Sequence, residues 1–245
     1  MRAGFLEHLE ELRWRLIASI AAIVGFSVAA YFFSGPILEF FLSPLKAAGG
    51  DYTLYFHSPY EAFLTRLKLS FLTGILAASP VLFTELWLFV APGLHRHEKK
   101  KTFLLVVSSV ILFFGGVAFA FWALVPFGLK FFLGFQTDTL RPLLGITPYF
   151  SFLVGMILAC GVFFDLPVVV LGLVAAGVLN VEQLKKARKW VIVFFFVASA
   201  VITPTTDPVT QTLLTIPLIV FYEICILIGG FLRKKDKNES PLRRR

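Results

Sequence analysis

Long apolar stretches separated by short polar ones dominate the chain. Most of them carry no charged residue, and two are interrupted by a single carboxylate each, Glu85 and Glu223. The stretches are residues 16–33, 69–91, 103–129, 143–164, 190–206 and 208–232. Because roughly 20 apolar helical residues cross the hydrocarbon core of a bilayer, this pattern predicts an all-α membrane protein.

The number of spans depends on how residues 165–181 are interpreted. The chain continues without charge after Asp165, which would allow a seventh span. Asp165, Leu166 and Pro167 leave no room for a turn, however, and a membrane helix tolerates a proline as a kink. We therefore expect one transmembrane domain, residues 1–232, followed by a basic cytoplasmic tail, residues 233–245. Its six spans are expected at about residues 14–33, 65–90, 103–129, 148–178, 190–203 and 209–230.

The basic residues fall unevenly between the two sides that six spans create. Of the 23 lysines and arginines, 18 lie on the side that holds both termini. Seven spans would place only 16 on one side. Since loops rich in Lys and Arg stay in the cytoplasm, both termini are predicted to be cytoplasmic. The net charge of +8 then reflects membrane topology rather than nucleic-acid binding.

Composition agrees with a membrane protein, because 58% of the residues are hydrophobic and 16% are charged. Soluble domains usually have about 45–50% hydrophobic and about 25% charged residues.

A cleaved signal peptide is an alternative for the N-terminus, since Ser27-Val28-Ala29 resembles a cleavage site. Two features argue against cleavage: the apolar run continues to Phe33, and Glu7, Glu10 and Glu11 do not suit the basic start of a signal peptide. Residues 190–202 offer only 13 apolar positions, so short fifth and sixth helices are expected.

Signatures of catalysis are missing from the sequence. It has no phosphate-binding GxxxxGK[ST] loop and no GxSxG motif. His97-Glu98 begins like a zinc-protease motif, but Lys101 replaces the second histidine. The two cysteines, Cys160 and Cys225, both lie in apolar runs and suggest neither a disulfide nor a metal site. We expect no enzyme activity, no catalytic residue, no metal and no cofactor.

Three carboxylates within or near the spans need an explanation, because charge inside a membrane is costly. They are Glu85, Asp165 and Glu223. Either each lies at an interface or beside a polar partner, or it has a function. Asp165 is the strongest functional candidate, and we expect it to line a concave face of the helix bundle that water can reach. A proton- or ion-coupled secondary transporter using Asp165 and Glu223 is the alternative, although the paired repeats of such transporters are not visible.

The N-terminal segment is predicted to be an amphipathic helix. Phe5, Leu9, Leu12 and Leu16 are spaced by four, three and four residues, and Glu11 lies off this apolar stripe. The segment could simply lie in the interface with its charges solvated. It could also recognise a cationic peptide, because a carboxylate binds guanidinium through two parallel hydrogen bonds.

The sequence resembles a known family, the TatC family of twin-arginine protein translocases, over nearly the whole chain. The resemblance rests on several short motifs that occur in the family's order. They are His8-Leu9-Glu10-Glu11-Leu12-Arg13-Trp14-Arg15-Leu16, Ser43-Pro44-Leu45, Ser58-Pro59, Ala78-Ser79-Pro80-Val81-Leu82, Phe89-Val90-Ala91-Pro92-Gly93-Leu94, His97-Glu98, Phe164-Asp165-Leu166-Pro167, Thr203-Pro204 with Asp207, and Gln211-Thr212-Leu213-Leu214-Thr215-Ile216-Pro217.

The resemblance implies a core receptor protein in the bacterial cytoplasmic (inner) membrane, with a thylakoid-type membrane as the other location. Such a receptor binds Arg-Arg signal peptides of folded cargo proteins. It works with single-span companion subunits in an oligomeric complex that is driven by the proton-motive force. Membrane lipid would surround it, and nucleic acid is not an expected partner. A membrane scaffold without a peptide site is a further alternative.

The resemblance also assigns roles to single residues. Signal-peptide binding would fall to Glu11 and Glu98, with Phe89 and Arg15 near them. Asp165 would be the acidic residue on the concave membrane-embedded face, at a position where the family often has glutamate. Two further pairs complete the assignment: Pro44 and Asp207 in the structured outer loops, and Thr203 and Gln211 where a companion helix docks.

Overall fold

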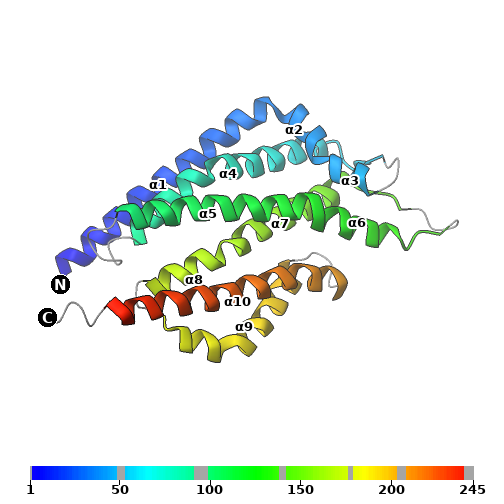
Figure 1. Ribbon diagram of the computed structural model, residues 1–245. Helices are drawn as coiled ribbons and strands as arrows, with labels where there is room; N and C mark the ends of the chain where they lie inside the picture. The colour runs from blue at the N-terminus through cyan, green and yellow to red at the C-terminus, as the bar shows by residue number, and fades with distance from the viewer. Residues whose placement is uncertain are drawn as a thin grey trace.

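Helices make up almost all of the chain that the computed structural model describes, residues 2–48, 53–90, 99–137, 142–175, 179–202 and 208–239 (Figure 1). Within those ranges the only β pairing is an isolated bridge between Tyr55 and Gly145. The helices are α1 (Arg2–Phe32), α2 (Ser34–Phe41), α3 (Ser43–Ala47), α4 (Glu61–Val90), α5 (Lys99–Phe119), the π-helix η2 (Ala120–Leu124), α6 (Val125–Leu133), α7 (Ile146–Phe164), α8 (Leu166–Ala175), α9 (Val181–Ile202) and α10 (Pro208–Glu239).

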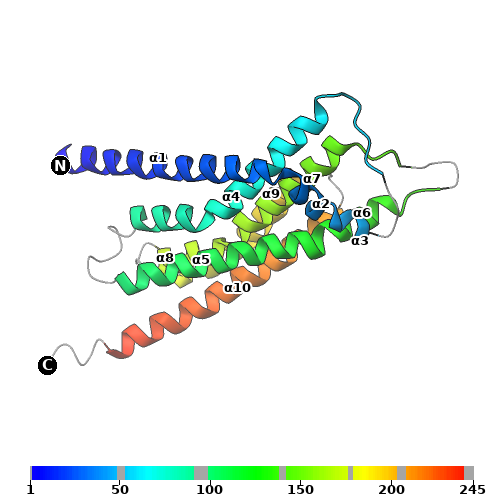
Figure 2. The same cartoon turned by 90° about the horizontal axis from the view of Figure 1, so that it is seen from above.

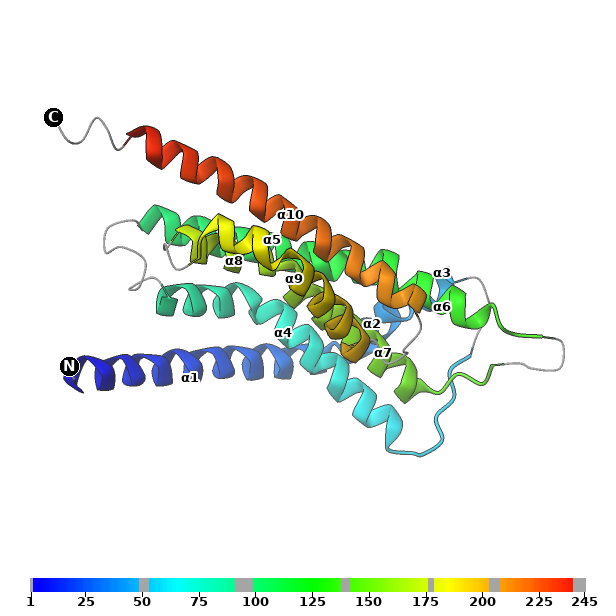
Figure 3. The ribbon, with the colours of Figure 1, turned by 90° about the horizontal axis from the view of Figure 1, so that it is seen from below.

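The long helices run side by side and give the molecule two distinct ends. One end, here called the terminal end, holds the start of α1, the end of α4, the start of α5 and the end of α10 (Figures 2 and 3). The other, the loop end, holds α2, α3 and α6. Both ends of the described chain therefore lie on the same side of the bundle.

Within the described residues, five helical stretches are long and apolar enough to cross a membrane. They are Leu9–Phe32, Glu61–Phe89, Phe103–Leu133, Ile146–Val174 and Pro208–Gly230. The fourth passes through Asp165, which alone separates α7 from α8. Helix α9 is not among the five, because its first turns carry Lys185, Lys186, Arg188 and Lys189.

The expectation of a short sixth helix is wrong. Helix α10 has 32 residues, and 23 of them form a candidate span. Pro217 lies inside α10 without ending it, so the helix continues past the position where a proline would break a helix in water. The fifth expected helix corresponds to α9, whose 22 residues include the 13-residue apolar stretch and the basic segment before it.

The core lies around α7. Phe150, Leu153, Met156 and Ile157 of this helix are fully buried, together with Leu69 and Leu72 of α4. Helix α1 lies outside this core and packs along α4, and the two backbones come close together where Gly74 faces Ser27. A Cβ at Gly74 would lie only 2.7 Å from the Ser27 Cα, so the absence of a side chain permits this approach.

Prolines within the spans are accommodated by local hydrogen bonding. Pro80 lacks an N–H group, so it leaves the Leu76 carbonyl without its usual helical donor. The Ser79 hydroxyl donates to that carbonyl instead, with an Oγ–O distance of 2.8 Å. Before Pro126 the chain forms the π-helix η2, in which the Val125 N–H bonds to the Ala120 carbonyl. A widened turn of this kind relieves the clash between a proline ring and the preceding turn.

At the loop end, the connection between α3 and α4 is tied to the start of α7. The Tyr55 N–H donates to Leu144 O at 2.9 Å, and the Ile146 N–H donates to Tyr55 O at 2.8 Å. Ser58-Pro59 followed by Glu61 is a sequence pattern typical of a helix start, and α4 begins at Glu61. Thr147-Pro148 is a similar pattern, but α7 begins at Ile146 and the Thr147 hydroxyl caps no backbone N–H.

Candidate functional site

A cluster of three charged side chains joins α1 to α4 near the terminal end. Arg15 donates to Glu11 Oε1 from Nε at 3.1 Å and from Nη2 at 2.5 Å, both within α1. Its Nη1 donates to Glu85 Oε2 of α4 at 3.1 Å. The guanidinium therefore bridges two helices through two carboxylates, and the three groups together carry one net negative charge. We call Glu11, Arg15 and Glu85 the carboxylate cluster.

The carboxylate cluster is half-buried. The exposed fractions of the side chains are 37% for Glu11, 21% for Arg15 and 26% for Glu85. Charged hydrogen bonds in such partly desolvated surroundings are stronger than those between fully solvated groups. Glu11 is the most accessible of the three, so it is the member that a ligand reaches most readily. The site thus already shows how Glu11 binds a guanidinium group.

Phe89 and Glu98 are also expected at this site, and of these two the structure describes only Phe89. Phe89 follows Glu85 by four residues on α4, so the two lie on neighbouring turns of the same helix face. Its ring is half-buried. Glu98 lies outside the described residues. The structure thus brings Glu11 and Arg15 together and places Phe89 one turn beyond their partner.

The pairing of Glu85 with Arg15 was not predicted from the sequence. A signal was present: Arg15 and Glu85 each interrupt or border an apolar run close to a predicted cytoplasmic end. Two opposite charges at the same membrane depth on neighbouring helices favour pairing, because an unpaired charge there is costly. What the sequence lacked was any sign that the first two spans are adjacent along their length.

Asp165 lies at the break between α7 and α8 and is buried, with 7% of its surface exposed. Its carbonyl accepts the N–H groups of Val168 and Val169 at 3.0 and 3.2 Å, which continues the helix across the break. The hydroxyl of Ser109 is a polar neighbour of the carboxyl group. Ser109 also accepts a hydrogen bond from the Trp87 indole at 2.9 Å. Within the described chain, Asp165 therefore faces the interior of the bundle, and a water-reaching face there stays a prediction.

A polar patch links α9 to α10. Gln211 donates from Nε2 to the Phe196 carbonyl at 2.7 Å, and the Ser199 and Thr215 hydroxyls lie 2.9 Å apart. Gln211 is the expected contact for a companion helix. Thr203, the other expected contact, and Asp207 lie outside the described residues.

Pro44 lies in the first turn of α3 at the loop end, where it is buried. Tyr149 of α7 secures this region by donating its hydroxyl to the Phe41 carbonyl at 2.8 Å. Pro44 is therefore part of the packed loop end. Among the side chains that the structure describes, no three His, Cys, Asp or Glu residues gather as metal ligands, and Cys160 and Cys225 are both free thiols.

The fold and the carboxylate cluster together define a multi-pass helical membrane protein with an anionic site at one end of its bundle. The model of the family "Sec-independent protein translocase protein (TatC)" matches residues 7–217. The chain belongs to the TatC family.

Individual relatives and solved structures agree with this assignment. The TatC protein of Magnetococcus marinus is 41% identical over 98% of this chain and 89% of its own length. That of Desulforapulum autotrophicum is 44% identical over the same shares. A crystal structure of the twin-arginine translocase receptor TatC is 38% identical, covers 91% of this chain and 98% of the other, and superposes with a TM-score of 0.82.

Proposed function

We propose that this chain is the core receptor of a twin-arginine translocase and binds consecutive arginines of signal peptides through Glu11. The observation that carries the proposal is the bond that Glu11 already makes to a guanidinium, through Nε and Nη2 of Arg15. A carboxylate offers about four acceptor positions, so it can bind a second guanidinium beside the first. Arg15 positions the Glu11 carboxylate, and Glu85 neutralises Arg15 so that the cluster stays attractive to a cation.

A signal peptide carries two guanidinium groups, and a second carboxylate serves the second one. Glu98 is the candidate, because it directly precedes α5, which begins at the terminal end where the carboxylate cluster lies. Phe89 supplies an aromatic ring one turn beyond Glu85, and a guanidinium can stack on such a ring. These assignments follow the family resemblance together with the positions of α1, α4 and α5.

We further propose six membrane crossings, with α9 as the fifth and both termini in the cytoplasm. The excess of basic residues on the terminal side and the placement of α1 and α10 support this arrangement. Helix α9 brings only 13 apolar residues, or about 20 Å, against a hydrocarbon core of about 30 Å. The bilayer is therefore thinned beside α9, or α9 sits off-centre.

The remaining roles concern assembly and transport. Single-span companion proteins dock at the polar patch of Gln211. Asp165 takes part later in the proton-motive-force-driven cycle, on the concave membrane-embedded face of the helix bundle. The bacterial inner membrane is the proposed location. The transporter alternative is weaker, since Glu223 is paired with Arg188 at 2.7 Å and both side chains are more than 40% exposed.

Titration of the purified protein in detergent with a synthetic Arg-Arg signal peptide tests the receptor proposal. Glu11→Gln is expected to weaken binding about tenfold, because a charge-assisted hydrogen bond contributes about 1.5 kcal/mol or more. A Lys-Lys peptide is expected to bind more weakly than the Arg-Arg peptide, since lysine lacks the planar fork. Glu10→Gln is the matched control, because Glu10 is exposed on the same turn of α1. Equal affinities for the wild type and Glu11→Gln would refute the proposal.

A further inference from the structure

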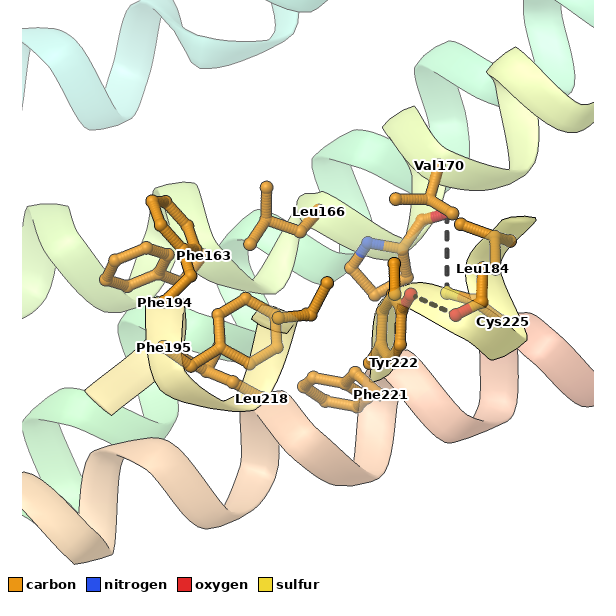
Figure 4. Close-up of a pocket in the computed structure, with 13 residues that line it drawn as sticks. Phe163, Leu166, Val170, Leu184, Phe194, Phe195, Leu218, Phe221, Tyr222 and Cys225 are labelled. Carbon is orange, nitrogen blue, oxygen red and sulfur yellow. Dashed lines mark hydrogen bonds between the residues drawn. The ribbon is translucent and has the colours of Figure 1, made fainter. Parts of the chain in front are cut away.

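A cavity of about 240 Å³ lies between the end of α7, α8, α9 and α10 (Figure 4). Its walls are almost entirely apolar. The two polar side chains that reach it are both engaged with backbone carbonyls: the Tyr222 hydroxyl donates to Leu184 O at 2.9 Å, and the Cys225 thiol donates to Pro167 O at 3.7 Å. Among the described lining residues, no polar side chain is left to hold water.

A cavity of this kind does not remain filled with water. An ordered water needs two to four polar partners, and apolar cavities of similar size bind apolar molecules instead. In a membrane protein the surrounding apolar material is the hydrocarbon of lipid tails. An empty cavity would also forfeit the dispersion contacts of its lining. The chemistry of the walls therefore favours a hydrocarbon chain.

The cavity is elongated along α9. It extends from Leu184 near the start of this helix to Phe195, and Figure 4 shows Leu184 and Cys225 at one end and Phe195 and Leu218 near the other. Eleven residues of helix correspond to about 16 Å. This shape suits one extended acyl chain.

Basic residues gather at the Leu184 end of the cavity. Lys185 directly follows the lining residue Leu184, and Arg188 directly follows the lining residue Ala187. Both basic side chains reach solvent, and that of Arg188 is 46% exposed. Glu223 is the nearby carboxylate on α10, and it is paired with Arg188 at 2.7 Å. Because α9 carries two further lysines against a single carboxylate of its own, positive charge dominates this end.

We propose that this cavity is a binding site for one anionic phospholipid. One acyl chain lies along α9 between α8 and α10, and the phosphate lies at Lys185 and Arg188. A long basic side chain can bury its stem against the acyl chain while its charged end reaches the headgroup. The bound chain fills the space beside α9, whose apolar stretch is too short to cross a bilayer. This site is separate from the carboxylate cluster and does not depend on signal-peptide binding.

Native mass spectrometry of the delipidated protein tests the site. The protein is titrated with phosphatidylglycerol and with phosphatidylcholine of the same acyl chains, and phosphatidylglycerol is expected to bind more tightly. Lys185→Gln should weaken phosphatidylglycerol binding about fivefold, the effect of one basic residue near an anionic lipid, and leave phosphatidylcholine unchanged. Lys46→Gln, on α3 at the loop end, removes the same charge far from the cavity and should have no effect. Equal binding of the two lipids to the wild type would overturn the headgroup assignment.

A second variant tests the acyl-chain part. Ala187→Phe fills the cavity and should reduce the binding of both lipids, whereas Val193→Phe, at an exposed position of α9 outside the lining, should not. If Ala187→Phe misfolds, phosphatidylglycerol with a photoactivatable acyl chain tests the wild type, and labelling is expected near Phe195 and Leu218. Labelling elsewhere would overturn the proposal. Crosslinking of a cysteine at 187 to a companion protein instead of lipid would show that a protein helix occupies the cavity, and would also overturn it.

Discussion

Helices α1 and α7 are both apolar enough to cross a bilayer, but the molecule uses them in opposite ways. In the most apolar stretch of the α1 span only 6% of the residues are buried, against 50% in the span formed by α7 and α8. Helix α7 supplies the centre of the core, whereas α1 packs mainly along α4. Apolar character alone therefore does not reveal which spans hold the bundle together.

The comparison shows that the proposed peptide site lies away from the packed core of the fold. Glu11 lies on the peripheral helix, where its side chain stays accessible and its position is set by Arg15 and Glu85 rather than by dense packing. Asp165 lies at the end of the core helix and is buried. A substitution in α1 should therefore affect binding before stability, and a substitution in α7 the reverse.

The largest expected effect is a difference in the free energy of unfolding between substitutions in α7 and in α1. Phe150→Ala in α7 removes a fully buried ring and should lower the free energy of unfolding by about 3–5 kcal/mol. Phe26→Ala in α1 removes a ring that is 44% exposed and should lower it by only about 0.5 kcal/mol. Denaturant titration of both variants in the same detergent measures the difference. Similar losses for the two variants would mean that α1 contributes to the core as much as α7 does.

The next effect tests how α1 is held on α4. Gly74→Val places a side chain against the Ser27 backbone and should push α1 away from α4, at a cost of about 1–3 kcal/mol. Gly25→Val is the control, because no atom lies within 4 Å of a Cβ at that position of α1. Spin labels at Trp14 and Leu86, both exposed, report the separation of the helices. An unchanged distance in Gly74→Val would show that the two helices are not fixed by this close approach.

Hydropathy was sufficient to predict the helical class and the approximate position of most long helices. It also predicted that Asp165 would interrupt rather than end a span, because Leu166 and Pro167 leave no space for a turn. The family resemblance then identified Glu11 and Arg15 as candidate site residues, and these two lie in contact.

Tertiary placement was not predictable from the same information. Apolar periodicity in a membrane helix does not say which face meets another helix, since lipid is as apolar as a protein core. The pairing of Arg15 with Glu85 and the burial of Asp165 both depend on that choice. The start of α7 shows a local limit as well: Thr147-Pro148 has the pattern of a capped helix start, yet the helix already begins at Ile146, before the threonine.

The smallest expected effect concerns the charge of the carboxylate cluster. Glu85→Gln removes one of two carboxylates that share Arg15, so the cluster changes from one net negative charge to neutral. Attraction for an Arg-Arg peptide should fall roughly two- to fivefold at low salt, the scale of a partly exposed ion pair. The difference in affinity should shrink as salt rises, because screening acts on the accessible charges.

Glu39→Gln, which removes a carboxylate on α2 at the loop end, should leave affinity unchanged and serves as the control. Peptide titrations at two salt concentrations distinguish the outcomes. If Glu85→Gln binds as tightly as the wild type at low salt, then Glu85 fixes α1 to α4 without contributing to recognition, and the anionic character of the site comes from Glu11 alone.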